Sequence, residues 1–143
     1  MKSKPANNIQ DLQFFGEFGG VNPSISDSST YTFLSANSMS ETFEGNMEGC
    51  YLYSRNAAPS NLYLEEALAA LEGTEAANVF SSGMGAITGT IVQLCKSEDH
   101  IISSRTVYGG TYACLKKFTP QLKIETTFVD ITSLDEINSS IKP

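Results

Sequence analysis

The chain has 143 residues, enough for one domain of ordinary size. Hydrophobic residues make up 41% of it and charged residues 17%, which favours a globular protein over a disordered one. The formal net charge of −7 argues against nucleic acid as a partner, because no basic stripe is present to neutralise phosphates.

No targeting or membrane signal is visible in the sequence. The start lacks the apolar run of a signal peptide, and no apolar stretch is long enough to cross a membrane. The cysteines Cys50, Cys95 and Cys114 are odd in number and lack CxxC spacing, which argues against a zinc site and a disulfide framework. We therefore expect a cytoplasmic protein with no membrane partner and no metal.

The first fifty residues show little periodicity. Residues 16–30 are predicted to form an irregular extended segment, with Gly-Gly and Asn-Pro pairs as turn signals. The aromatic residues Phe14, Phe15 and Phe18 favour an arm that wraps a partner subunit, because a solvated tail does not need them. A disordered tail is the alternative.

A helix is predicted over residues 61–72. Ser60 is a plausible N-cap, and Gly73 follows the end of the helix. Three leucines fall on one face at helical spacing: Leu64, Leu68 and Leu71.

Strands and helices then alternate. Apolar patterning predicts strands at residues 76–80, 100–103 and 124–128, and helices at residues 84–95, at 111–118 and after Ser133. Pro120 is expected to stop the second of these helices, Asp130 is a good capping residue, and Ser133 with Glu136 forms a capping box. The sole histidine, His100, is more plausibly structural than catalytic. Strands separated by helices predict an α/β fold with a parallel sheet.

A phosphate site is predicted where the first strand meets its helix. At residues 82–84 (Ser-Gly-Met), the first N–H groups of a helix lack internal partners, and Gly83 leaves room for an anion. An ordinary capped helix without a ligand is the alternative. A nicotinamide fold is a poorer second interpretation, because Thr88 replaces the third glycine of G-x-G-x-x-G and no acidic residue follows the second strand.

Two further groups suit such a ligand. Tyr53 and Arg55 are separated by one residue, so in an extended segment both side chains point to one side and suit a phosphate dianion. Tyr108 follows the second strand, where its ring could stack on a flat cofactor and its hydroxyl could exchange protons beside a cation. An interface arginine and a tyrosine at the sheet edge are the structural alternatives.

In combination these segments resemble the Cys/Met-metabolism family of pyridoxal-phosphate enzymes, closest to its methionine γ-lyase and cystathionine γ-synthase-like branch. The resemblance runs from about Gly16 to the end. It is carried by residues 16–22 (Gly-Glu-Phe-Gly-Gly-Val-Asn), 51–55 (Tyr-Leu-Tyr-Ser-Arg), 68–73 (Leu-Ala-Ala-Leu-Glu-Gly), 82–84, 108–111 (Tyr-Gly-Gly-Thr) and 128–130 (Phe-Val-Asp). Where the family commonly has Asn-Pro-Thr, this chain has Ala58-Pro59-Ser60.

The resemblance implies a fold and a site. It implies an extended arm over residues 1–58 and, over residues 59–143, the first and incomplete part of a fold-type-I pyridoxal-phosphate domain with a mostly parallel sheet and flanking helices. Gly83 and Met84 would give N–H groups to the phosphate of pyridoxal 5′-phosphate. Tyr53 and Arg55 would reach that phosphate from the neighbouring subunit of a homo-oligomer, a dimer of dimers. Tyr108 would stack on the pyridine ring and assist proton transfer.

The implied function is a C–S lyase or transferase of sulfur amino-acid metabolism. It would eliminate or replace the γ-substituent of methionine, cystathionine or an O-acyl-homoserine. The family's Schiff-base lysine lies downstream of the matched residues, so we expect this chain alone to be inactive. The alternatives are a non-catalytic truncated homologue acting as a binding or assembly module, and an inactive gene fragment.

Overall fold

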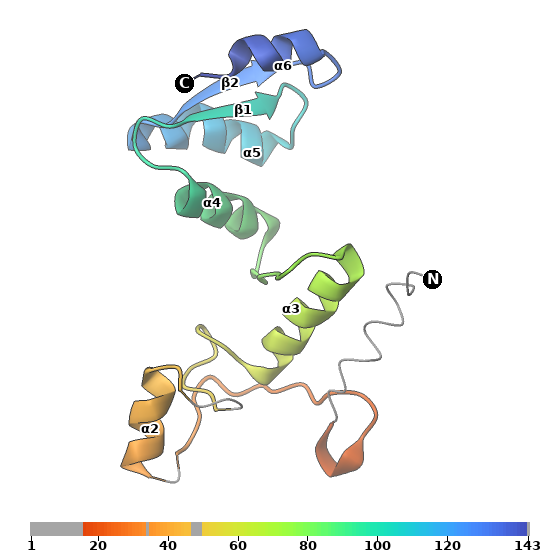
Figure 1. Cartoon of the computed structure of the whole chain (residues 1–143), viewed down its shortest axis with the longest axis vertical. Coiled ribbons are helices and arrows are strands. Elements are labelled where there is room, and N and C mark those ends of the chain that lie inside the picture. The colour runs from red at the N-terminus through yellow and green to blue at the C-terminus, as the bar shows by residue number, and fades with distance from the viewer. Residues whose placement is uncertain (1–15, 34, 47–49, 143) are drawn as a thin grey trace. The chain divides into compact units, whose positions relative to one another are not determined.

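The computed structural model describes residues 16–33, 35–46 and 50–142, and the chain divides into two compact units, Met1–Val79 and Phe80–Pro143. Figure 1 shows the helices and strands of both units. The aromatic residues Phe14 and Phe15 of the predicted arm lie outside the described residues. None of the described helices has the length and apolar character needed to cross a membrane. The boundary expected between residues 58 and 59 stays a prediction.

The first unit contains a short 3-10 turn, η1 (Glu17–Gly19), and two helices, α2 (Ala36–Phe43) and α3 (Pro59–Glu72). The segment before α2 is irregular, as predicted, and its apolar side chains have few contacts: Phe18 is 104% exposed, Val21 88% and Ile25 91%.

The start of α3 differs from the prediction. The helix begins at Pro59 with Ala58 as its N-cap, so Ser60 is not the cap. Proline is pre-organised for the first helical position, where its missing N–H costs no hydrogen bond. The Ser60 hydroxyl instead accepts a hydrogen bond of 2.7 Å from the Ser26 N–H and so ties the irregular segment to the helix.

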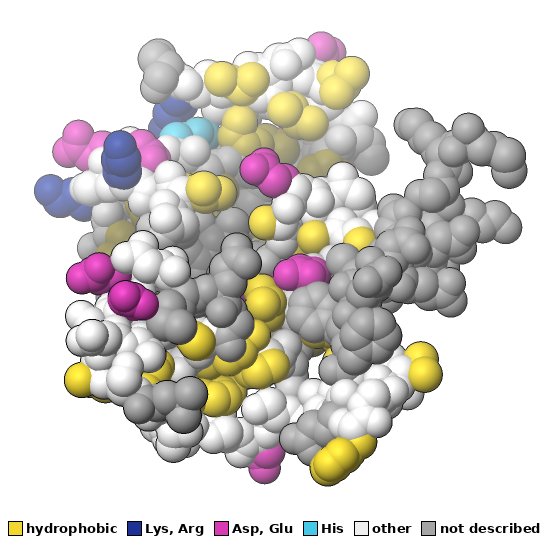
Figure 2. All heavy atoms as spheres, turned by 60° about the horizontal axis from the view of Figure 1, so that its bottom comes forward, with side chains coloured by type: hydrophobic (Ala, Val, Ile, Leu, Met, Phe, Trp, Pro, Cys, Tyr) yellow, Lys and Arg dark blue, Asp and Glu magenta, His cyan; other side chains and the backbone are white. Residues whose placement is uncertain are grey.

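The end of α3 matches the prediction, because Gly73 has φ 69° and forms a left-handed cap. The predicted leucine face is not a core face in this unit: Leu64, Leu68 and Leu71 are between 38% and 45% exposed, whereas Ala67 and Ala69 are buried. Figure 2 shows hydrophobic side chains at the surface of the described residues.

The second unit begins with α4 (Gly83–Leu94) and continues through β1 (His100–Ser104), α5 (Gly109–Ala113), β2 (Glu125–Val129) and α6 (Leu134–Ser140). The two strands are parallel, with His100 opposite Glu125 and Ser104 opposite Val129. Figure 1 shows α5 on one side of the strands and α6 on the other. The α/β class and the parallel pairing are confirmed.

The sheet of the described residues has two strands and not the predicted three. Residues 76–80 form no strand, because an apolar segment becomes one only when another strand pairs with it. The backbone N–H of Val79 donates to the Glu65 carboxylate at 3.0 Å instead.

Helical structure after Tyr108 extends further than predicted. It begins at Gly109, passes through a π-helical turn, η2 (Cys114–Phe118), and ends in a 3-10 helix, η3 (Thr119–Leu122). Pro120 therefore does not stop the helix. It lies near the start of a new helical turn, where its lack of an N–H is tolerated.

The capping box before α6 is only half formed. The Ser133 hydroxyl accepts from the Glu136 N–H at 3.2 Å, as predicted, but the Glu136 carboxylate accepts from the Asp130 N–H and from Arg105. Asp130 is not the helix cap. Its carboxylate accepts two hydrogen bonds from Thr132, which lower the pKa of Asp130.

The core of the second unit is small and lies where η2 and η3 meet β2. Leu115, Thr119, Ile124 and Val129 are each less than 5% exposed. The Thr119 hydroxyl donates to the Leu115 carbonyl at 3.0 Å, so this buried polar group is satisfied.

This core predicts a contrast between two isoleucines. Replacing Ile124, which is 2% exposed, with alanine should lower the free energy of unfolding by about 2–5 kcal/mol, because it leaves a cavity. The same change at Ile131, which is 60% exposed, should alter it by no more than about 0.5 kcal/mol. Urea unfolding followed by circular dichroism measures both. Equal losses would show that Ile124 is not a core residue.

Candidate functional site

The first turn of α4 leaves two backbone donors free. Ser82 is the N-cap, and its hydroxyl accepts from the Gly85 N–H at 3.0 Å, while its carbonyl accepts from the Ala86 N–H. Among the described residues, no acceptor bonds the N–H groups of Gly83 and Met84. A side-chain carbon added at Gly83 would meet nothing within 4 Å, so the space there is open. Free donors beside open space suit an anion.

The start of α5 lies beside this turn. A side-chain carbon added at Gly110 would lie near both the Tyr108 ring and the Met84 sulfur. The Thr111 hydroxyl also contacts the Met84 sulfur, at 3.8 Å. The structure therefore brings together the predicted residues Met84 and Tyr108. The Tyr108 ring is 72% exposed, so one face of it is available to a ligand.

Tyr53 and Arg55 lie together in the first unit. Tyr53 forms an antiparallel bridge with Thr30, and the Ser54 N–H donates to the Ser29 carbonyl at 3.0 Å. Residues 54–56 form a turn and not the extended segment that was predicted. The Arg55 guanidinium nevertheless lies over the Tyr53 ring, 5.1 Å from its centre, which is a cation–π arrangement.

This turn borders an open recess of about 650 Å³ in the first unit. Arg55 is exposed there, and no carboxylate of the described residues pairs with its guanidinium. Asp27 and Asn61 also line the recess, and sequence reasoning missed both. No motif marks them, because they come from segments separated in the chain from Tyr53.

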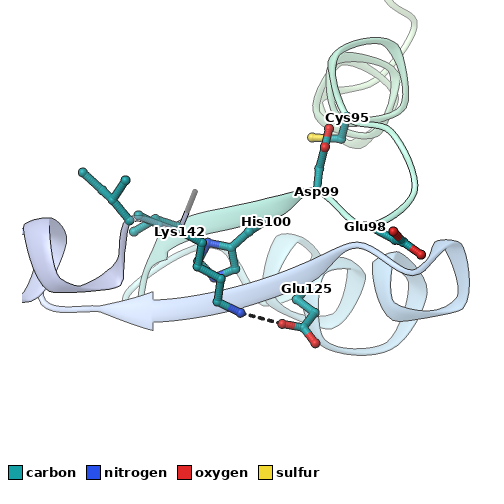
Figure 3. Close-up of a pocket in the computed structure, with 8 residues that line it drawn as sticks. Cys95, Glu98, Asp99, His100, Glu125 and Lys142 are labelled. Atoms are coloured by element: carbon teal, nitrogen blue, oxygen red, sulfur yellow. Dashed lines mark hydrogen bonds and ion pairs between the residues drawn. The ribbon is translucent and has the colours of Figure 1, made fainter.

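A second recess, of about 550 Å³, lies in the second unit and is shown in Figure 3. It is lined by Cys95, Glu98, Asp99, His100, Ile102, Glu125, Ile141 and Lys142. The His100 ring and the Thr127 hydroxyl share a hydrogen bond of 2.7 Å. His100 therefore has a structural partner on the adjacent strand. No group of three metal-ligating side chains is placed to hold an ion among the described residues.

An ion pair closes one side of this second recess. The Lys142 ammonium group donates to the Glu125 carboxylate at 2.6 Å (Figure 3). This hydrogen bond and the charge of Lys142 lower the pKa of Glu125, with a smaller contribution from His100. The contacts account for Glu125 and Lys142 without a ligand.

The fold and the donors at α4 define an α/β protein with an anion-receptive helix N-terminus. Residues 7–143 match the family model described as Cys/Met metabolism PLP-dependent enzyme. The chain therefore belongs to the Cys/Met metabolism family of pyridoxal-phosphate-dependent enzymes.

Three relatives illustrate the match. The chain is 43% identical over 142 residues to methionine gamma-lyase of Arabidopsis thaliana, a match covering 96% of this chain and 32% of that protein. It is 45% identical over 93 residues to cystathionine gamma-lyase of Bacillus subtilis, a match that covers 65% of this chain and 24% of that protein. A solved structure of metY from Campylobacter jejuni, which contains N′-pyridoxyl-lysine-5′-monophosphate, superposes on this chain with a TM-score of 0.86 at 25% sequence identity. The superposition covers 98% of this chain and 34% of the metY chain. The chain thus spans about a third of the length of these relatives or less.

The residues present fit the phosphate and the ring of pyridoxal phosphate. Among the described residues, the N–H groups of Gly83 and Met84 have no acceptor, and the space beside Gly83 is open. The Tyr108 ring and the Met84 sulfur both lie close to the position that a side chain at Gly110 would take. An anion-receptive turn next to an exposed aromatic ring is the donor set that a phosphorylated, planar group requires.

The ion pair at the second recess gives a pH-dependent prediction. Replacing Lys142 with methionine should raise the pKa of Glu125 towards its ordinary value, because the main cause of the lowering is removed. Since the pKa of Glu125 is lower in the folded protein, the pair stabilises the fold at neutral pH. That contribution is lost as the pH falls through the lowered pKa.

Carboxyl-carbon NMR measures the titration of Glu125 directly. Lys96→Met removes the same charge from the loop before β1 and serves as the control. An equal rise of the Glu125 pKa in both variants would assign the effect to net charge and not to the ion pair.

Proposed function

We propose that this chain supplies the phosphate cradle and the ring-stacking tyrosine of an enzyme that breaks or makes a C–S bond at the γ-carbon of an amino acid. The observation that carries the proposal is the pair of free N–H groups at Gly83 and Met84 beside the exposed Tyr108 ring. The substrate class is methionine, cystathionine or an O-acyl-homoserine. The names of two relatives, methionine gamma-lyase and cystathionine gamma-lyase, describe enzymes of this kind.

The cradle would bind the phosphate of the cofactor through backbone donors and the dipole of α4. Ser82 stabilises this turn, because its hydroxyl accepts a hydrogen bond from the Gly85 N–H. The N–H groups of Gly83 and Met84 are then left for the anion. When bound, pyridoxal phosphate withdraws electrons from the carbon that loses a proton. Tyr108 would cover one face of the pyridine ring, and its hydroxyl would hold or return a proton near the leaving γ-substituent.

Tyr53 and Arg55 complete the cradle from a second copy of the chain in a homo-oligomer, arranged as a dimer of dimers. Support comes from the exposed guanidinium, which has no carboxylate partner among the described residues. A phosphate would satisfy it through charge-assisted hydrogen bonds. The division into an arm (residues 1–58) and an incomplete cofactor domain (residues 59–143) belongs to this proposal, with the exposed Phe18, Val21 and Ile25 of the arm facing the partner copy.

Turnover needs more than these residues. The resemblance places the lysine that anchors the cofactor outside the matched stretch, so the 143-residue chain is expected not to catalyse the reaction alone. The alternative is a non-catalytic assembly module, which the exposed apolar arm favours. A module of this kind would co-purify with a longer homologue and bind no pyridoxal phosphate of its own.

A chimera separates the two functions. Residues 7–143 would replace the segment of Arabidopsis methionine γ-lyase that they match, which is about a third of that protein. If this chain carries a working cradle, the chimera binds pyridoxal phosphate and releases a thiol from methionine. A folded chimera of native size that fails to bind the cofactor would reject the enzymatic proposal and favour the assembly module.

The same chimera tests Arg55. Arg55→Lys should weaken pyridoxal-phosphate binding by about tenfold or more, because lysine cannot make the two parallel hydrogen bonds that arginine offers a phosphate. Arg105→Lys is the matched control, since Arg105 is the other arginine of the sequence and is paired with Glu136 at 2.9 Å. Equilibrium titration of the apo-chimera gives both dissociation constants. Equal affinities in the two variants would remove Arg55 from the site.

A further inference from the structure

Two adjacent glycines at the start of α5 have different surroundings. A side-chain carbon at Gly109 would meet nothing within 4 Å. The same carbon at Gly110 would lie 2.6 Å from Cε1 of Tyr108 and 3.2 Å from Sδ of Met84. Both distances are shorter than van der Waals contact, so position 110 has no room for a side chain while this ring and this sulfur stay in place.

The atoms that crowd Gly110 belong to two elements. Tyr108 precedes α5, and Met84 belongs to the first turn of α4. The Thr111 hydroxyl also donates to the Met84 sulfur, at 3.8 Å. The Met84 side chain thus links the first turn of α4 to the first turn of α5.

We propose that Gly110 is a positioning residue for the cofactor site, acting through Tyr108. Because Gly110 lacks a side chain, the Tyr108 ring and the Met84 sulfur can both occupy the space beside the first turn of α5. The ring and the free donors of α4 then form one continuous surface for a phosphorylated pyridine. This inference deepens the proposed function and rests on it.

A side chain at Gly110 displaces the ring and leaves the helix intact. The atoms it meets are the ends of side chains, and Tyr108 is 72% exposed, so the ring has space to rotate away. Outside the backbone of its own helix, the three nearest atoms all belong to the side chains of Tyr108 and Met84. Gly110→Ala is therefore expected to fold and to keep the donors of α4 while moving the ring.

The first measurement needs no cofactor. The sequence has four methionines, so methyl-labelled methionine gives a simple NMR spectrum in which Met84→Leu identifies the Met84 signal. An NOE between the Met84 methyl group and the Tyr108 ring is expected in the 143-residue chain and in Gly109→Ala, and should be lost in Gly110→Ala. An unchanged NOE in Gly110→Ala would overturn the proposal.

The second measurement uses pyridoxal 5′-phosphate as the probe, titrated into the same proteins and followed by its phosphorus resonance. Gly110→Ala should weaken binding by about three- to tenfold, the loss expected when one stacking ring moves away. Gly109→Ala should stay within about twofold of the unmodified chain. Equal affinities in the two variants would overturn the role of Gly110.

A double-mutant cycle separates positioning from general damage. In a Tyr108→Ala background the ring is gone, so adding Gly110→Ala should change binding by no more than about twofold. The Tyr108→Ala background also removes the shortest contact of the new side chain, the one with Tyr108. The double variant can therefore still be measured if Gly110→Ala alone unfolds. A full additional loss in that background would reject action through Tyr108. If the unmodified chain shows a folded spectrum but no binding, the cradle itself is rejected, and the role of Gly110 with it.

Discussion

The proposed site depends on two N–H groups at the start of α4, which have no acceptor among the described residues. A helix N-terminus concentrates partial positive charge, but in open solvent water satisfies it at little cost. It becomes a binding site only when neighbouring groups add favourable contacts with a ligand. In this chain the Ser82 hydroxyl keeps the turn tight, Gly83 leaves it open, and Tyr108 adds an apolar wall. In the proposed site, phosphate recognition and ring recognition would therefore be adjacent, because the Met84 sulfur and the Tyr108 ring both lie close to Gly110.

Much of the fold follows from local pattern. The helix of residues 83–94 and the strands of residues 100–104 and 125–129 were predictable, because hydrophobic periodicity and caps act within a few residues. One failure has a non-local cause, and two others come from proline. Residues 76–80 have strand composition, but a strand needs a neighbour that no local pattern supplies. At Pro59 and Pro120 the helix-compatible first-turn role of proline outweighed its role as a breaker.

The candidate site was only partly predictable. Gly83, Met84 and Tyr108 were singled out because the sequence predicted that strands give way to helices at these points. The structure has a strand before Tyr108, β1, but none directly before Gly83. The difference between Gly109 and Gly110 could not be found, since it exists only relative to Tyr108 and Met84. The recess beside Arg55 was missed for the same reason, because it is assembled from segments that are distant in the chain.

Net charge explains why the local groups matter so much. The formal charge of −7 repels a phosphate dianion at long range, although salt screens that repulsion beyond about 8 Å. Affinity must therefore come from donors in direct contact with the anion. The chain has two arginines, and the Glu136 carboxylate already engages Arg105. Arg55 has no carboxylate partner among the described residues, and its guanidinium lies over the Tyr53 ring, which leaves its charge unneutralised. In the proposed site it is therefore the arginine available to a phosphate.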